Sequence, residues 1–345
     1  MRTITSVTLL LVALCAAPPL AADGLRLTIL HTNDLHARYR PLSLSGRKVG
    51  GFARLAALIR SLRAKDTTLT LHAGDLFQGT VLFTHFRGRL GLELLSKMGF
   101  DAMTLGNHEF DLGVAPLVAA LRGVGFPVLC ANLVLPKTSE LRRRLVPFTI
   151  VVRSGVRIGL IGLLTPEEEV FRRNLGLTIS DPVAAAKRAV AELEKRGVRH
   201  IILVSHIGLP WDQKVARSVA GIDVIVGGHT HTALHHPVWL RSPRGEPVMI
   251  VQAGSMSRYL GHVVAQFDTR GVLVRGKSAA RLLRIVASPG EKGYIVPDPW
   301  FVARIAKAAK QLGSWTTAVV GRSTTPLWHK LDRESPLGNL VTDAI

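Results

Sequence analysis

Short apolar runs alternate with amphipathic stretches from residue 25 onward. The runs are rich in β-branched and aliphatic residues, which predicts buried strands. Between several of them apolar residues recur every three or four positions, which predicts helices. Strands alternating with helices in this way predict an α/β domain whose sheet is fed at least partly by crossover connections. The predicted strands cover residues 25–30, 68–73, 102–105, 127–132, 157–163, 200–205, 223–228 and 248–254.

The clearest helix signal lies at residues 182–197. Asp181 is a good N-cap, Pro182 suits the first helical position, and Gly197 ends the segment. Periodicity predicts two further helices, over 51–65 and 297–313. Additional strands are expected at 262–268, 271–276 and 316–327, and a last helix begins within 333–345.

These elements predict four parts of the chain. Residues 1–22 form a leader, 23–296 one α/β domain, 297–313 a linker helix, and 314–345 the start of a second domain. A chain of 345 residues can bury a large core without disulfides or a structural metal.

The charge is strongly positive. Forty-four Lys and Arg oppose 24 Asp and Glu, a formal charge of +20, which favours anionic partners. The basic residues are scattered, and the densest run, 142–144, lacks the interleaved aromatic side chains of a single-strand-binding surface. Zinc-finger and RNP motifs are absent as well, so we expect no nucleic-acid partner and interpret most of the charge as basic residues spread over a solvated surface.

The first 22 residues have the pattern of a secretory leader. Arg2 supplies positive charge, residues 7–17 form a short apolar run, and Ala21-Ala22 are small residues suited to cleavage. The run is too short to span a bilayer comfortably, and no later stretch is long and apolar enough. We therefore expect a periplasmic or secreted protein without stable membrane insertion.

The cysteines exclude two classes of site. Cys15 follows Leu14, a poor fit to the small residue that lipidation requires, so lipid anchoring is not expected. After cleavage only Cys130 remains, which excludes an internal disulfide and a cysteine-based metal site. Cys130 lies in an apolar run and is expected to be buried.

Five of the predicted strands run directly into polar clusters. In α/β sheets, ligands gather beyond the carboxyl ends of the strands, so clusters far apart in sequence can converge in space. The clusters are His31–His36, His72–Asp75, Gly106–Asp111, Ser205–His206 and Gly227–His231.

The residue types in these clusters favour a metal site. Asp34 and His36 are two positions apart and point the same way in an extended loop, and His229 and His231 repeat this spacing. Asp75 follows a glycine that permits a sharp turn, and its two oxygens could bridge two cations. Carboxylates, imidazoles and an amide without thiolate suit Zn, Mn, Fe or Co better than Ca or Mg.

The clusters also resemble a known family. The segments ILHTNDLHAR, LHAGDLFQGT, LGNHEFDLG, SHIGL and GGHTHT, in this order, resemble the five metallophosphoesterase motifs of the 5′-nucleotidase family, within the calcineurin-like superfamily. The resemblance covers residues 25–345. It implies an α/β/β/α sandwich and a two-metal hydrolase of nucleotide phosphate esters, including 5′-nucleotides, 2′,3′-cyclic phosphates or UDP-sugars.

Matched position by position, the resemblance implies a set of metal ligands. Asp75 would bridge two divalent ions, Zn, Mn or Co, and His231 stands where some relatives have Gln or Asn. One metal would be held by Asp34, His36, Asp75 and His231, and the other by Asp75, Asn107, His206 and His229.

The resemblance implies a catalytic pair as well. Asp111 would orient the imidazole of His108, which stabilises or protonates the phosphoryl group in the transition state. The metals would activate a water molecule for in-line attack on phosphorus. Glu109 is expected to serve loop packing, and Arg258 lies where the family places its last active-site loop.

Residues 333–345 resemble the first helix of the family's second domain, which supplies residues for phosphate and base. We therefore expect the chain to be truncated there and to discriminate poorly among nucleotides. Two other functions stay open: a thiosulfohydrolase of bacterial sulfur oxidation on the same scaffold, and a non-catalytic metal- or nucleotide-binding protein. The oligomeric state is not predicted.

Overall fold

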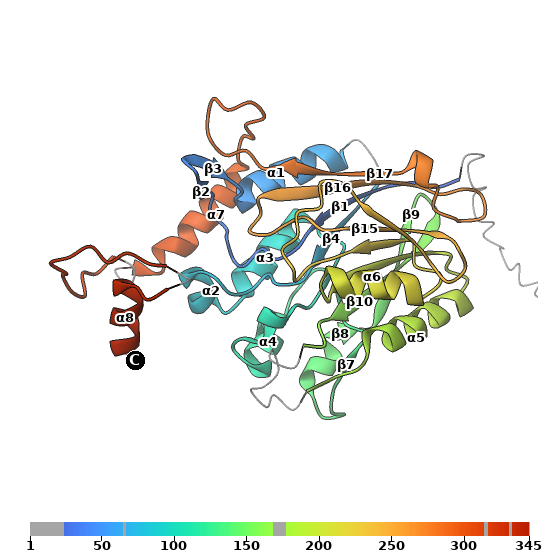
Figure 1. Ribbon diagram of the computed structural model, residues 1–345, viewed down its shortest axis with the longest axis horizontal. Coiled ribbons are helices and arrows are strands. Elements are labelled where there is room, and N and C mark those ends of the chain that lie inside the picture. The colour runs from blue at the N-terminus through green and yellow to red at the C-terminus, as the bar shows by residue number, and fades with distance from the viewer. Residues whose placement is uncertain (1–23, 65–66, 168–176, 314–316, 331–332, 345) are drawn as a thin grey trace, which may run out of the picture.

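The computed structural model describes residues 24–64, 67–167, 177–313, 317–330 and 333–344 (Figure 1). The predicted leader, 1–22, lies outside these residues. Among the described residues, no helix combines the length and the apolar composition needed to cross a bilayer.

Two β-sheets pack face to face at the centre of the fold. One has seven strands in the order β17-β16-β1-β4-β5-β6-β8, and the other six in the order β14-β15-β13-β12-β10-β9. The first contains β1 (Arg26–Thr32), β4 (Thr68–Ala73), β5 (Ala102–Thr104), β6 (Val128–Leu129), β8 (Leu145–Val146), β16 (Tyr259–Gln266) and β17 (Ala279–Arg284). The second contains β9 (Phe148–Arg153), β10 (Val156–Leu164), β12 (His200–His206), β13 (Val224–Val226), β14 (Val238–Arg241) and β15 (Pro247–Val251).

Helices cover the outer faces of both sheets (Figure 1). On the first sheet lie α1 (Phe52–Arg63), α2 (Val81–Phe86), α3 (Arg89–Met98), α4 (Val114–Ala120) and α7 (Pro299–Lys310). On the second lie α5 (Pro182–Lys195) and α6 (Leu209–Ser218). The remaining elements include α8 (Pro336–Asp343), a small hairpin of β2 (Leu42–Leu44) with β3 (Arg47–Val49), and a two-stranded sheet of β7 (Leu133–Val134) with β11 (Thr178–Ile179). The predicted α/β/β/α sandwich is confirmed.

Strand β12 shows why the strands are continuous apolar runs in the sequence. Ile202 and Val204 face the other sheet, whereas Ile201 and Leu203 face α5 and α6, and all four are buried. Alternate residues of a strand point to opposite faces, so a strand covered on both sides must be apolar throughout.

The predicted helix signals act as expected. The Asp181 carboxylate accepts a hydrogen bond from the Ala184 amide (2.7 Å), and Pro182 opens α5. Asp298 caps α7 in the same way through the Trp300 amide (2.9 Å).

Two strand predictions are wrong. Residues 271–276 make only an isolated bridge, Phe267 with Leu273, and β17 takes the place beside β16. Within 316–327, the described residues 317–327 contain no strand. Val319 and Val320 there are 78% and 100% exposed, and a segment rich in β-branched residues forms a strand only where another strand pairs with it.

The layer between the sheets should dominate stability. Leu160 is fully buried there, whereas Leu44 in β2 is 44% exposed. Leu160→Ala should lower the free energy of unfolding by about 2–5 kcal/mol, because it removes buried methyl groups and leaves a cavity. Leu44→Ala is the matched control and should change it by less than about 0.5 kcal/mol. Urea denaturation measures the change for each variant. Equal midpoints for the two variants would contradict the claim that the layer between the sheets dominates stability.

Candidate metal centre

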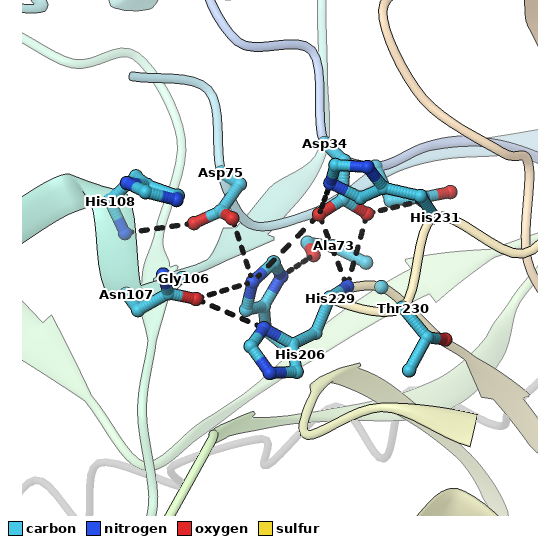
Figure 2. Close-up of polar contacts among 12 residues, drawn as sticks. Asp34, Ala73, Asp75, Gly106, Asn107, His108, His206, His229, Thr230 and His231 are labelled. Atoms are coloured by element: carbon cyan, nitrogen blue, oxygen red, sulfur yellow. Dashed lines mark hydrogen bonds and ion pairs between the residues drawn. The ribbon is translucent and has the colours of Figure 1, made fainter. Parts of the chain in front are cut away.

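The five polar clusters meet at one edge of the sandwich (Figure 2). They follow β1, β4 and β5 of the first sheet and β12 and β13 of the second. Within each sheet these strands are parallel neighbours, so their carboxyl ends lie at a common edge. All nine predicted site residues lie there: Asp34, His36, Asp75, Asn107, His108, Asp111, His206, His229 and His231.

Asp34, His36 and His231 form one group of donor atoms within 4.8 Å of one another. The Nε2 atoms of His36 and His231 face each other at 3.0 Å, and His231 Nε2 lies 3.3 Å from Asp34 Oδ1. Two facing imidazole nitrogens can share only one proton in a direct hydrogen bond. Their convergence beside a buried carboxylate is therefore what a cation between them would require.

Asp75, His206 and His229 form a second such group. His206 Nε2 lies 3.2 Å from Asp75 Oδ2, and the Asn107 carbonyl oxygen lies 3.3 Å from His206 Nε2 and 3.0 Å from His229 Nδ1. Asp75 also belongs to a third group with His36 and His108, which places it between the other two. Nitrogen and oxygen donors in this arrangement fit two borderline divalent metals that share Asp75.

Hydrogen bonds on the side of the ring away from the donor atoms fix the tautomers of His206 and His229. His206 Nδ1 lies 2.6 Å from the Ala73 carbonyl oxygen, which can only accept, so Nδ1 carries the proton and Nε2 faces the cluster. His229 Nε2 lies 3.0 Å from Glu167 Oε2, which leaves Nδ1 directed at Asn107. A carboxylate or carbonyl behind a histidine is the usual support of a metal ligand.

The backbone of the cluster is strained. Five of the site residues are not glycine yet have positive φ: Asp34 (49°), His36 (45°), Asp75 (56°), His229 (76°) and His231 (53°). Gly74 (79°) makes the turn predicted before Asp75. Left-handed conformations are unfavourable for such residues and concentrate at functional sites, where the surrounding structure imposes them.

Glu109 packs the loops of the cluster together, as expected, through four hydrogen bonds. It is 2% exposed, and its carboxylate accepts hydrogen bonds from the amides of Gly106 (2.5 Å), Asp75 (3.0 Å), Leu76 (2.9 Å) and Phe77 (3.1 Å). It thereby ties the loop after β4 to the turn after β5. Burial first, and then the charge of Asp75, raise the pKa of Glu109 to about 7.

Asp75 and His206 shift each other's ionisation. Burial alone would raise the pKa of Asp75, but the neighbouring His206 outweighs it and holds that pKa well below its usual value. Burial alone would lower the pKa of His206, but Asp75 raises it to about 10. A cation that binds both groups must therefore displace a proton from His206.

His108 and Asp111 lie in contact, as predicted. His108 Nδ1 donates to Asp111 Oδ2 at 2.9 Å, and the His108 amide donates to Asp75 Oδ1 at 2.9 Å. The hydrogen bond to Asp111 is the main reason why the pKa of His108 is raised. The His108 side chain is 31% exposed, so it lies at the open side of the cluster.

The Arg258 side chain is held in place by two hydrogen bonds to Ser255. Its Nε donates to the Ser255 carbonyl (3.1 Å), and its Nη2 lies 3.2 Å from Ser255 Oγ. The same loop lies against the site, since the Met256 amide donates to the Asp34 carbonyl at 2.7 Å.

Known proteins resemble this chain along most of its length. The family model for calcineurin-like phosphoesterase matches residues 27–233. A snake venom 5′-nucleotidase of Gloydius brevicauda is 36% identical over 361 residues, which cover 96% of this chain and 60% of that protein. A probable 5′-nucleotidase of Treponema pallidum is 38% identical over a region that covers 79% of this chain and 50% of that protein.

Solved structures agree with the sequence matches. The 5′-nucleotidase precursor of Thermus thermophilus is 34% identical, with a TM-score of 0.82 over 92% of this chain and 66% of that one. The chain thus spans about 60% of the length of the venom enzyme and 66% of the Thermus protein. The matched region contains every residue of the metal cluster, and the chain belongs to the calcineurin-like phosphoesterase family.

Proposed function

We propose that this protein hydrolyses phosphate esters of nucleotides with the help of two divalent metal ions. Its family uses a dimetal centre, and the chain has His and Asp groups able to hold one. The observation that carries the proposal is the position of Asp75 between two groups of donors. The similarity to 5′-nucleotidases supports nucleotides as the substrate class.

The proposed ligand sets follow the two donor groups. The side chains of Asp34, His36 and His231 converge on one side of Asp75, which favours them as ligands of one metal. The second metal would be bound on the other side of Asp75, where Asn107 Oδ1 faces both His206 and His229. Zn, Mn or Co suits this mixture of imidazole, carboxylate and amide.

The bound metals supply a Lewis acid that activates water and neutralises phosphate charge. His108 completes the reaction from the open side. Asp111 accepts the hydrogen bond from Nδ1, so Nε2 is directed away from Asp111 and is available to a phosphoryl oxygen. The raised pKa of His108, caused mainly by the hydrogen bond to Asp111, favours the protonated imidazole. The water oxygen then bonds to phosphorus and gives up a proton as the ester P–O bond breaks, and the leaving oxygen takes up one proton, so that the products are an alcohol and phosphate.

Two alternatives give different observable results. A thiosulfohydrolase would cleave a protein-bound sulfonate and leave phosphate esters intact. A binding protein would have no use for the His108–Asp111 pair, whose contact favours an enzyme. The charge of +20 also favours phosphorylated substrates, since they are anionic.

Hydrolysis assays test the proposal directly. The purified chain should hydrolyse p-nitrophenyl phosphate, bis-p-nitrophenyl phosphate and AMP. EDTA should abolish this activity, and Mn²⁺, Zn²⁺ or Co²⁺ should restore it, because the ligands hold the metals reversibly. Elemental analysis should find two metals per chain.

His108→Ala is the matched variant for these assays. It should lower turnover by about 10²- to 10⁴-fold, the usual contribution of a proton-transferring side chain, and keep both metals. Activity on a protein-bound sulfonate alone would favour the thiosulfohydrolase. Two bound metals with unchanged binding of AMP and no turnover in either protein would favour the binding protein.

The pH profile tests the role of Asp111. The hydrogen bond from His108 to Asp111 raises the pKa of His108, so the active, protonated imidazole persists to higher pH. Asp111→Asn removes the charge and should lower that pKa. The alkaline limb of the kcat/KM profile should therefore move to lower pH, while the metal content stays at two. An alkaline limb at its original pH would show that His108 does not control it.

We also propose that the protein is exported, on the leader pattern of residues 1–22. Expressed with its leader in a Gram-negative host, the protein should appear in the periplasmic fraction. Its N-terminal residue, read by Edman degradation, should lie near residue 23, beyond the Ala-rich cleavage site. A full-length chain confined to the cytoplasm would refute export.

A further inference from the structure

The loop after β13 carries two of the proposed ligands, His229 and His231. Both have positive φ, an unfavourable conformation for histidine, and neither lies in a helix or strand. His229 lies in the donor group with His206, and His231 lies in the group with His36. The shape of this short loop therefore sets the distance between the two donor groups.

A single side chain closes the loop. Gln252 follows β15 and is fully buried. Its Nε2 donates to the Gly228 carbonyl at 2.9 Å. Its Oε1 accepts from the Thr230 hydroxyl at 3.1 Å and from the Thr232 amide. One amide thus joins the residue before His229 to the residue after His231.

The backbone beside Gln252 is fixed in turn to the other half of the site. Asn33 Oδ1 accepts from the Ala253 amide (2.8 Å), and Asn33 Nδ2 donates to the Gly254 carbonyl and to Asp34 Oδ2, both at 2.6 Å. The Asp34 carboxylate also accepts from the His229 amide at 3.0 Å. The segment after β15 is therefore a common support for Asp34 and for the loop of His229 and His231.

We propose that Gln252 is a positioning residue that sets the separation of His229 and His231, and through them the separation of the two metals. This rests on the proposed function, because it requires the two histidines to bind different metals. Both ends of the Gln252 amide are hydrogen-bonded to the loop and not to the proposed ligands. It acts through the backbone of the loop, and removing its contacts releases two left-handed residues toward ordinary conformations.

The amide is matched to its three partners. The Gly228 carbonyl needs a donor, whereas the Thr232 amide and the Thr230 hydroxyl need an acceptor. A glutamate of the same length can only accept when ionised, so it would place an oxygen against the Gly228 carbonyl. A methionine of similar length would offer neither strong contact. Gln252→Glu therefore breaks the hydrogen bonds that close the loop and adds a charge. Gln252→Met breaks the same hydrogen bonds without adding one.

Metal binding without substrate is the test. The metal-free full chain is titrated with Co²⁺ alone, followed by visible absorption, and Mn²⁺-loaded protein is measured by EPR, whose spin coupling reports the separation of the two ions. Wild type should bind two ions. Both Gln252 variants should bind at least one ion about 10- to 100-fold more weakly, which is the usual effect of replacing a residue that supports metal ligands. The Mn–Mn spin coupling should be lost or altered in both variants.

Gln266→Glu is the matched control, since Gln266 on β16 also donates to a carbonyl, that of Phe267, at 3.2 Å and lies outside the cluster. It should keep both ions and their coupling. If Gln252 variants do not fold, Thr230→Val removes one contact to Oε1 at an exposed residue and should weaken metal binding in the same direction.

The outcomes separate this inference from the proposed function. Variants that fold and bind two ions with the affinity and coupling of wild type would overturn the role of Gln252. Tighter binding by Gln252→Glu with unchanged binding by Gln252→Met would also overturn it, because charge alone would then explain the effect. Wild type that binds fewer than two ions would instead refute the dimetal centre itself.

Discussion

The hydrogen bond from His206 Nδ1 to the Ala73 carbonyl joins the two sheets at the point where the site forms. His206 ends β12 of one sheet, and Ala73 ends β4 of the other. The bond fixes the histidine tautomer, and it brings the loop of Asp75 against the second sheet. The packing leaves no spare room, since a Cβ at Gly106 would meet both His206 Nε2 and the Asp75 carboxylate. The geometry of the cluster therefore depends on how the sheets are stacked.

Burying carboxylates at this junction is unfavourable unless each one is hydrogen-bonded. The loops themselves supply the donors. The His229 amide donates to Asp34, the His108 amide to Asp75, and four amides to Glu109. Most of these bonds link two loops that are distant in sequence. The hydrogen bonds that stabilise the buried carboxylates therefore also hold the strained loops together. A substitution that removes one of these bonds would change both the ionisation of the carboxylate and the conformation of the loop.

The apolar pattern predicts an α/β domain and clusters at its strand ends, because both depend on local signals, whereas the sandwich itself was implied by the resemblance of the five motifs to a known family. Strands buried on two faces are continuously apolar, and each functional cluster directly follows such a strand. Gln252 and Glu167 escaped prediction because their partners are a distant loop and a distant histidine, and neither residue stands in a cluster. Glu109 lay inside a cluster, but its four amide contacts appear only in three dimensions. Residues 317–327 were mispredicted because their Val and Thr content favours a strand but does not show whether a neighbouring strand is present.

Exposure divides the cluster into two sides. The side chains of Asp34, Asp75 and His206 are at most 3% exposed, whereas those of His108 and His231 are 31% and 41% exposed. A phosphoryl group can approach only from the side of the latter two. In the proposed function the buried half holds the metals, and the open half, with His108 and His231 beside the 33% exposed Asp111, faces the substrate. Under the same proposal the cluster acts on the phosphoryl group, which nucleotide phosphate esters share, so its residues determine the reaction and not the choice of ester.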